Sequence, residues 1–166
     1  SVAGFTFYQA ILSTILTFVL GLPSAVLFSR FNFHGKSLLR ALTAVPFMLP
    51  TVVVASSFNA ILGTHGIFSF LFPLSFSSSS TFHFLLILTA HVFYNTTIVI
   101  RIVGNALSRL DPKLEAAARS LGADSFHVWK YIALPLLRPS LLAAALLVFM
   151  FDFTSFGVIL LLGGSN

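Results

Sequence analysis

Long apolar stretches separated by short polar segments set the pattern of this chain. A helix that crosses a bilayer needs about 20 predominantly apolar residues, and four stretches meet that requirement, approximately 5–28, 41–62, 81–100 and 140–162. The pattern therefore predicts an all-α fold, a polytopic membrane helical bundle with about four transmembrane helices. The chain starts at Ser1 and stops directly after the fourth stretch, so we expect a piece of a longer protein.

The second apolar stretch carries two prolines, Pro46 and Pro50, four residues apart. Each lacks a backbone N–H group and disfavours helical geometry in the residue before it. Membrane helices tolerate such breaks where neighbouring helices or water satisfy the freed carbonyl groups. We expect a bent or locally unwound helix here, for which a plain packing kink is the simplest interpretation.

Composition agrees with a membrane location. The chain is 57% hydrophobic and 8% charged, whereas soluble domains carry about 25% charged residues. It has no cysteine, and it lacks a phosphate-binding loop of the Walker type. Since neither paired carboxylates nor histidines at metal-ligand spacing occur, we expect no catalytic residue, no metal site and no cofactor.

The net charge of +5 comes from residues in two loops beside the apolar stretches. All nine lysines and arginines fall in segments 29–40 and 101–138, namely Arg30, Lys36, Arg40, Arg101, Arg109, Lys113, Arg119, Lys130 and Arg138. Because two spans separate these loops, both lie on one face, which the positive-inside rule makes cytoplasmic. This distribution predicts a multi-pass protein of the cell (inner) membrane and excludes a nucleic-acid partner. The uncharged segment 63–80, with His65, is then an outer loop.

The segment from Glu115 to Pro135 is the most polar long part of the chain, and its local signals predict two short helices around a turn. Asp111 can cap a helix that opens with Pro112, and Gly122 stands where a helix ends in a left-handed residue. Asp124 or Ser125 can cap a second helix over 126–132. We expect the chain to break at two proline pairs, Leu134-Pro135 and Arg138-Pro139.

The same segment resembles the Glu-Ala-Ala loop of permease subunits of type I ABC importers. The matching residues are Glu115, Ala116, Ala117, Gly122, Ile132, Leu134 and Pro135, at the spacing of that family. The resemblance implies that these residues and Arg119 dock on the ATPase subunits. Without it, Glu115 is an exposed acid favoured near a helix N-terminus.

The resemblance carries further expectations. It implies a dimer of ABC ATPase subunits, a second permease half or subunit, an extracytoplasmic solute-binding protein and the lipid bilayer as partners. A core in this family usually has five or more spans, so a leading and a trailing helix are expected to be missing. Segments 153–157 and 162–164 look most like the iron(III)- and thiamine-type permeases.

Four polar residues within the spans are candidates for a translocation path. Asp152 is the one acid inside a span, where it costs about 2.5–3.5 kcal/mol on insertion scales. Such an acid faces the bundle interior or a watery path. His91 and Asn95 share one face of the third span, and Asn59 lies in the second. The alternative for all four is hydrogen bonding that holds helices together.

Two other classes of protein remain open at this point. A fragment of an ATP-independent secondary transporter or channel fits the acid within a span and the broken second helix. That alternative shows no internal repeat and leaves the Glu-Ala-Ala pattern unexplained. A membrane anchor without transport of its own is the third alternative.

Overall fold

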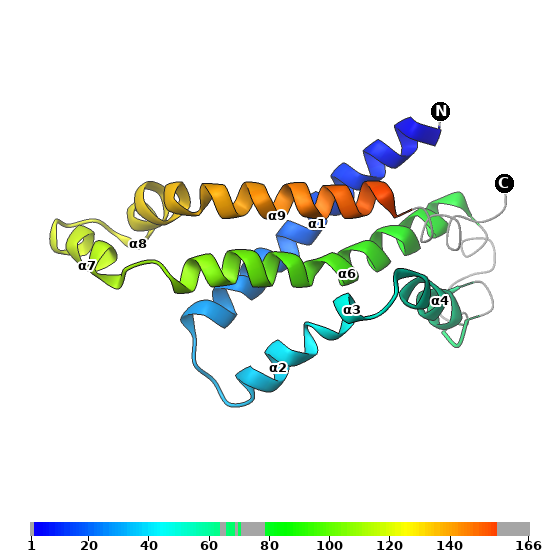
Figure 1. The fold of residues 1–166 in the computed structure, drawn as a ribbon, viewed down its shortest axis with the longest axis horizontal. Helices are drawn as coiled ribbons and strands as arrows, with labels where there is room; N and C mark the ends of the chain where they lie inside the picture. The colour runs from blue at the N-terminus through cyan, green and yellow to red at the C-terminus, as the bar shows by residue number, and fades with distance from the viewer. Residues whose placement is uncertain (1, 64–65, 69, 71–78, 156–166) are drawn as a thin grey trace.

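A computed structural model describes residues 2–63, 66–68, 70 and 79–155. His65, segment 162–164 and the ends of segments 140–162 and 153–157 lie outside the described residues. The helices, labelled as in Figure 1, are α1 (Val2–Arg30), α2 (Lys36–Leu42), α3 (Val45–Met48), α4 (Thr51–Leu62), α6 (Ser80–Ser108), α7 (Pro112–Ser120), α8 (Ser125–Val128), the π-helical segment η2 (Trp129–Ala133) and α9 (Leu134–Thr154). No strand occurs among these residues, and the expected all-α class is confirmed.

Three long helices form the centre of the bundle. Helices α6 and α9 run side by side, and α1 crosses both (Figure 1). Buried aliphatic side chains fill the space between them, among them Val99 and Val103 of α6 and Leu137 and Val148 of α9. α7 and α8 extend beyond one end of this bundle, opposite the end where α1 begins (Figure 1).

A stripe of small and polar residues allows α1 to approach α6 closely. Its members recur every fourth position, so they share one helix face, and each is buried: Gln9, Ser13, Thr17, Gly21 and Ala25. A Cβ atom at Gly21 would stand 2.7 Å from Cβ of Val99. The close packing of the two helices therefore depends on the missing side chain at Gly21.

Gly21→Ala should destabilise the bundle relative to Gly104→Ala. Both glycines lie at the interface of α1 and α6, and both substitutions gain the same helix propensity. The added Cβ at Gly104 comes no closer than 3.7 Å to Ala25, whereas the one at Gly21 collides with Val99. Overpacking typically costs about 1–3 kcal/mol, so thermal unfolding of the full-length protein in detergent should show a lower midpoint for Gly21→Ala. Equal midpoints for the two variants would contradict this packing.

The break expected at Pro46 and Pro50 is confirmed, and it is sharper than a kink. The segment Lys36–Met48 and helix Thr51–Leu62 meet at 101°. Leu49, which precedes Pro50, is extended at φ −82° and ψ 143°, as proline requires of its predecessor. The hydroxyl of Thr97 on α6 donates to the carbonyl of Thr43, which satisfies a backbone group freed between α2 and α3.

Within the part of the chain that the structure describes, three helices are long and apolar enough to cross a membrane, or four if the bent pair is one span. α6 is longer than the stretch 81–100 and continues to Ser108. Its last two turns remain helical because Val103 and Leu107 are buried in the core. The segment 101–108 is therefore helix and not loop.

The expected break at the two proline pairs is wrong. Helical backbone runs from Ser125 to Thr154 without interruption, so the short helix expected over 126–132 merges with the span. A proline lacks an N–H donor and its ring crowds the carbonyl four residues earlier. The π-helical segment η2 ends directly before Leu134 and Pro135, and such wider turns accommodate disruptions of this kind within a helix. Pro139 follows within α9.

Candidate functional site

Helix α7 is a short, exposed helix that is fixed at both ends. The carboxylate of Asp111 accepts from the backbone N–H of Lys113, 2.9 Å away, and Pro112 occupies the first turn. At the other end, Gly122 takes φ 88°. The N–H of Gly122 donates to the Arg119 carbonyl, and the N–H of Ala123 donates to the Ala118 carbonyl, both at 3.0 Å. This is the Schellman arrangement, and it confirms the caps expected at Asp111 and Gly122.

Asp124 caps the next helix, as one of the two expected alternatives. Its carboxylate accepts from the backbone N–H of His127 at 2.8 Å. This hydrogen bond and a second one to the His127 ring lower the pKa of Asp124. The turn between α7 and α8 therefore has caps on both of its flanks.

A long-range ion pair ties α7 to the end of α1. The guanidinium of Arg30, the last residue of α1, donates from two nitrogens to the two carboxylate oxygens of Glu115, one pair at 2.9 Å. Arg30 also lies 6.0 Å from the ring centroid of Trp129, at the outer limit of a cation–π contact. Glu115 is therefore not simply an exposed acid on the first turn.

The hydrogen bond from Arg30 lowers the pKa of Glu115, and the charges of Arg30 and Arg119 act in the same direction. A lowered pKa means that the ionised carboxylate is favoured in the folded state. The contact thus contributes fully above the ordinary pKa of a glutamate and is lost as the pH falls through the lowered value. At neutral pH the pair is intact.

The expected docking residues fall into two groups. Ala116, Ala117, Arg119 and Gly122 are exposed on α7 and its turn. The second group belongs to the junction of η2 and α9, where Ile132 and Pro135 are half-buried and Leu134 is 40% exposed. The first group projects from the bundle, whereas the second lies at the start of a membrane-spanning helix.

Large apolar side chains are exposed on α7 and in the segment that follows it. Leu121 is 89% exposed, and Phe126 and Leu114 are 67% and 47% exposed. Leu114 and Leu121 lie on α7 and its turn, and Phe126 lies in the first turn of the helix that leads into the last span. A water-facing surface gains nothing from such residues, and clusters of them are typical of protein interfaces.

A second candidate site is the buried polar cluster formed by Gln9 and Ser13 of α1, His91 and Asn95 of α6, and Asp152 of α9. The Asn95 amide donates to Asp152 Oδ1 at 2.5 Å, and His91 Nδ1 lies 3.8 Å from the same oxygen. Gln9 Nε2 lies 2.5 Å from His91 Nδ1. The buried hydroxyl of Ser13 lies beside the Asp152 carboxylate but has no hydrogen-bond partner among the described residues. All five side chains are at most 3% exposed.

The cluster borders a cavity of about 230 Å³ between α4, α6 and α9. Thr51, His91, Asn95 and Ser155 line it together with aromatic and small side chains. With Gln9 as the donor, Nδ1 of His91 is the acceptor, so a neutral ring carries its proton on Nε2. The arrangement offers donors and acceptors to a polar species in a space otherwise enclosed by apolar helices.

The structure joins three of the four candidate path residues and leaves one apart. His91, Asn95 and Asp152 meet in the cluster, whereas Asn59 is exposed on α4, where its carbonyl accepts from Gly63. Gln9 and Ser13 were missed by the sequence reasoning. Their signal was present as a polar stripe in the first apolar stretch, because Gln9, Ser13 and Thr17 recur at a spacing of four.

The fold and these two sites define a polytopic helical membrane protein with an exposed, capped loop helix and a buried polar cluster. The sequence matches the family described as "Binding-protein-dependent transport system inner membrane component" over residues 17–166. The chain belongs to this family, the permeases of ABC importers of the inner membrane. The resemblance drawn from the Glu-Ala-Ala pattern is thereby confirmed.

Named relatives agree with this assignment. The chain is 32% identical to the sulfate transport system permease protein CysT of Salmonella typhimurium, over 96% of this chain and 57% of that protein. It is 32% identical to the thiamine transport system permease protein ThiP of Escherichia coli (98% and 31%). It is 29% identical to the molybdenum transport system permease protein ModB of Azotobacter vinelandii (96% and 71%). The chain spans a little over half the length of the sulfate permeases it matches.

Proposed function

We propose that this chain is part of the translocation domain of an ATP-driven, binding-protein-dependent importer, and that α7 docks on the ATPase subunit. The whole assembly would comprise an ATPase dimer, a second permease half or subunit, and a solute-binding protein on the outer face. The two positively charged segments, 29–40 and 101–138, would face the cytoplasm, including the loops and the ends of α6 and α9 that they contain. Family membership, the positive charge of these loops and the exposed apolar surface around α7 support the proposal.

The observation that carries the proposal is a double connection between the segment formed by α7 and α8 and the buried polar cluster. One connection is the ion pair from Glu115 to Arg30, the last residue of α1. The other is the unbroken helical backbone that leads from α8 through η2 into α9. α1 carries Gln9 and Ser13 of the cluster, and α9 carries Asp152.

This arrangement provides a physical route for coupling. A displacement of α7 by its docked partner would act on the inner ends of two helices that meet at the cluster. ATP binding would then shift an equilibrium between two arrangements of the bundle, because packed helices move as rigid elements. The polar cluster, at the place where α1, α6 and α9 meet, would line the path that opens and closes.

Reversal of either charge in the Arg30–Glu115 pair should reduce the binding-protein-stimulated ATPase activity of the assembled transporter about fivefold. Exposed ion pairs contribute about 0.2–1 kcal/mol, and Arg30→Glu or Glu115→Arg replaces that attraction with repulsion. The double variant with both reversals restores opposite charges and should recover most of the activity. If the double variant is no more active than the weaker single variant, α7 is not coupled to α1 through this pair.

A further inference from the structure

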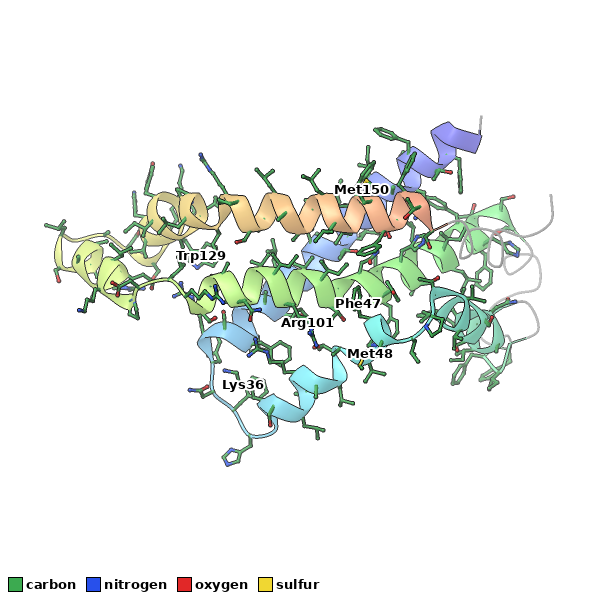
Figure 2. All side chains as sticks on the ribbon, in the orientation of Figure 1. Lys36, Phe47, Met48, Arg101, Trp129 and Met150 are labelled. Atoms are coloured by element: carbon green, nitrogen blue, oxygen red, sulfur yellow. The ribbon has the colours of Figure 1, made fainter. Side chains whose placement is uncertain are left out.

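A basic pocket lies beside the bend of the second span, at the junction of α2 and α6. Arg40 and Arg101 line its walls together with Ser37, Thr43 and Asn105, and the pocket has a volume of about 400 Å³. Figure 2 shows Arg101 on the side of α6 that faces α2. The lining thus combines two arginines with serine, threonine and asparagine and contains no acidic residue. The Thr43 hydroxyl donates to the Arg40 carbonyl at 2.8 Å.

The two arginines have donors to spare. Arg40 donates to the side-chain oxygen of Asn105 at 3.0 Å, which holds its guanidinium across the gap between α2 and α6. None of the four acids of the chain lines the pocket: Glu115 pairs with Arg30 and Asp152 is in the buried cluster, while Asp111 and Asp124 cap helices. An oxyanion would complement this pair of charges, since guanidinium groups bind phosphate in a forked geometry.

A large apolar groove continues from the same place. It has a volume of about 850 Å³, and its walls come from α1, α2, α3, α4 and α6. Thr43 and Ile100 line both the groove and the basic pocket. The other lining residues are aliphatic, aromatic or threonine, including Leu42, Pro46 and Phe93, and none is charged. Polar and apolar sites are therefore joined end to end.

We propose that this composite site binds an acidic phospholipid, with its phosphate at Arg40 and Arg101 and an acyl chain in the groove. A free oxyanion would use the pocket but not the groove. An apolar helix, of another subunit or of the part of this protein outside residues 1–166, would use the groove but leave the arginines without a counter-charge. Basic pockets between membrane helices on the cytoplasmic side bind anionic head groups. By the rise of 1.5 Å per residue, Arg101 lies about 10 Å along α6 from Ser108, where that helix ends.

The test measures lipid bound to the full-length permease in its assembled transporter. The protein is reconstituted in nanodiscs of mixed phosphatidylglycerol and phosphatidylcholine, released into the gas phase, and its retained lipids are counted by native mass spectrometry. We expect retained phosphatidylglycerol, and at least fivefold less of it in the Arg40→Gln/Arg101→Gln variant. Arg109→Gln, which removes an arginine from outside the pocket, should retain as much as wild type.

The groove is tested separately from the charges. Thr96 lines the groove, and its hydroxyl bonds only to Val92 of its own helix among the described contacts. Thr96→Trp should therefore fill the groove and reduce retained phosphatidylglycerol while both arginines remain. Added inorganic phosphate should not displace the lipid.

Three outcomes would overturn the proposal. If the amount of retained phosphatidylglycerol does not depend on Arg40 and Arg101, another occupant, such as a helix of a partner subunit, fills the site. Displacement by inorganic phosphate, with no effect of Thr96→Trp, would assign the pocket to a free anion. Equal retention of phosphatidylcholine would show that charge is not recognised. Because both leaflets of a nanodisc have the same composition, the result does not depend on the topology or on the coupling proposed above.

Discussion

Gly122→Val should reduce the amount of ATPase subunit that co-purifies with the full-length permease at least tenfold. Gly122 ends α7 at φ 88°, a conformation that costs residues with a side chain about 1–2 kcal/mol and a β-branched residue more. The Schellman hydrogen bonds to the carbonyls of Arg119 and Ala118 depend on this positive φ. Loss of the turn would misplace Ala116 and Ala117 on their partner, while the spans stay folded in the bilayer.

Two control variants separate docking from backbone strain. Gly35 also has a positive φ, 82°, and a Cβ at Gly35 or at Gly122 would meet no atom within 4 Å. Gly35→Val therefore imposes the same strain in the other loop and should leave ATPase binding near the wild-type level. Gly122→Asn should bind better than Gly122→Val, since asparagine tolerates the left-handed region. Wild-type co-purification of Gly122→Val would remove the docking role from this turn.

Asp152→Asn should reduce transport at least tenfold while the assembled complex persists. The carboxylate is fully buried, accepts from Asn95 and lies beside His91. Asparagine has nearly the same shape and replaces the ionisable carboxyl group with an amide, so the packing of α9 on α6 is retained. If the polar cluster lines the path, the substitution changes the electrostatic environment that the substrate crosses.

Asp124→Asn is the matched control for this prediction. Asp124 is an exposed cap in the loop, and asparagine caps a helix about as well as aspartate, so transport should be unchanged. Uptake of substrate into vesicles and the amount of ATPase subunit in the purified complex are measured together. Unchanged uptake by Asp152→Asn would leave the cluster with a purely structural role between helices.

The parts of this fold that the sequence predicted correctly rest on local signals. The proline pair at Pro46 and Pro50 breaks the second span because each proline acts on its immediate neighbours. Asp111 and Gly122 end α7 as expected, since a cap is decided by two or three adjacent residues. The placement of the bundle in a membrane follows from the length of the apolar stretches.

The parts that were missed depend on residues far apart in the chain. Arg30 and Glu115 are separated by 85 positions, and nothing local distinguishes Arg30 from the other arginines near a span. Gln9 and Ser13 were overlooked within an apolar stretch, although their spacing of four places them on one face. Only the crossing of α1 over α6 and α9 brings that face to Asp152.

The proline pairs at the start of α9 were misinterpreted for a different reason. A local rule predicts a break at each proline, but the rule assumes that the neighbouring turns keep α-helical geometry. The π-helical segment Trp129–Ala133 changes that geometry. Burial of Ala133 and Leu137 in the core then stabilises a continuous helix.

The docking of α7 on the ATPase subunit is tested most directly by crosslinking from a cysteine introduced at Ala117 in a full-length permease from which any other cysteine has been removed. The 166 residues contain no cysteine. Ala117→Cys places a thiol on the exposed small face of α7. Ile67→Cys, at a position 73% exposed, is the comparison on the predicted outer side. We predict that a short crosslinker with one thiol-reactive and one photoreactive end joins Ala117→Cys to the ATPase subunit in membranes. An impermeant thiol reagent should fail to label Ala117→Cys in intact cells, whereas Ile67→Cys should be labelled and not crosslinked. Labelling of Ala117→Cys from outside, or no crosslink to the ATPase subunit, would show that α7 does not dock on that subunit.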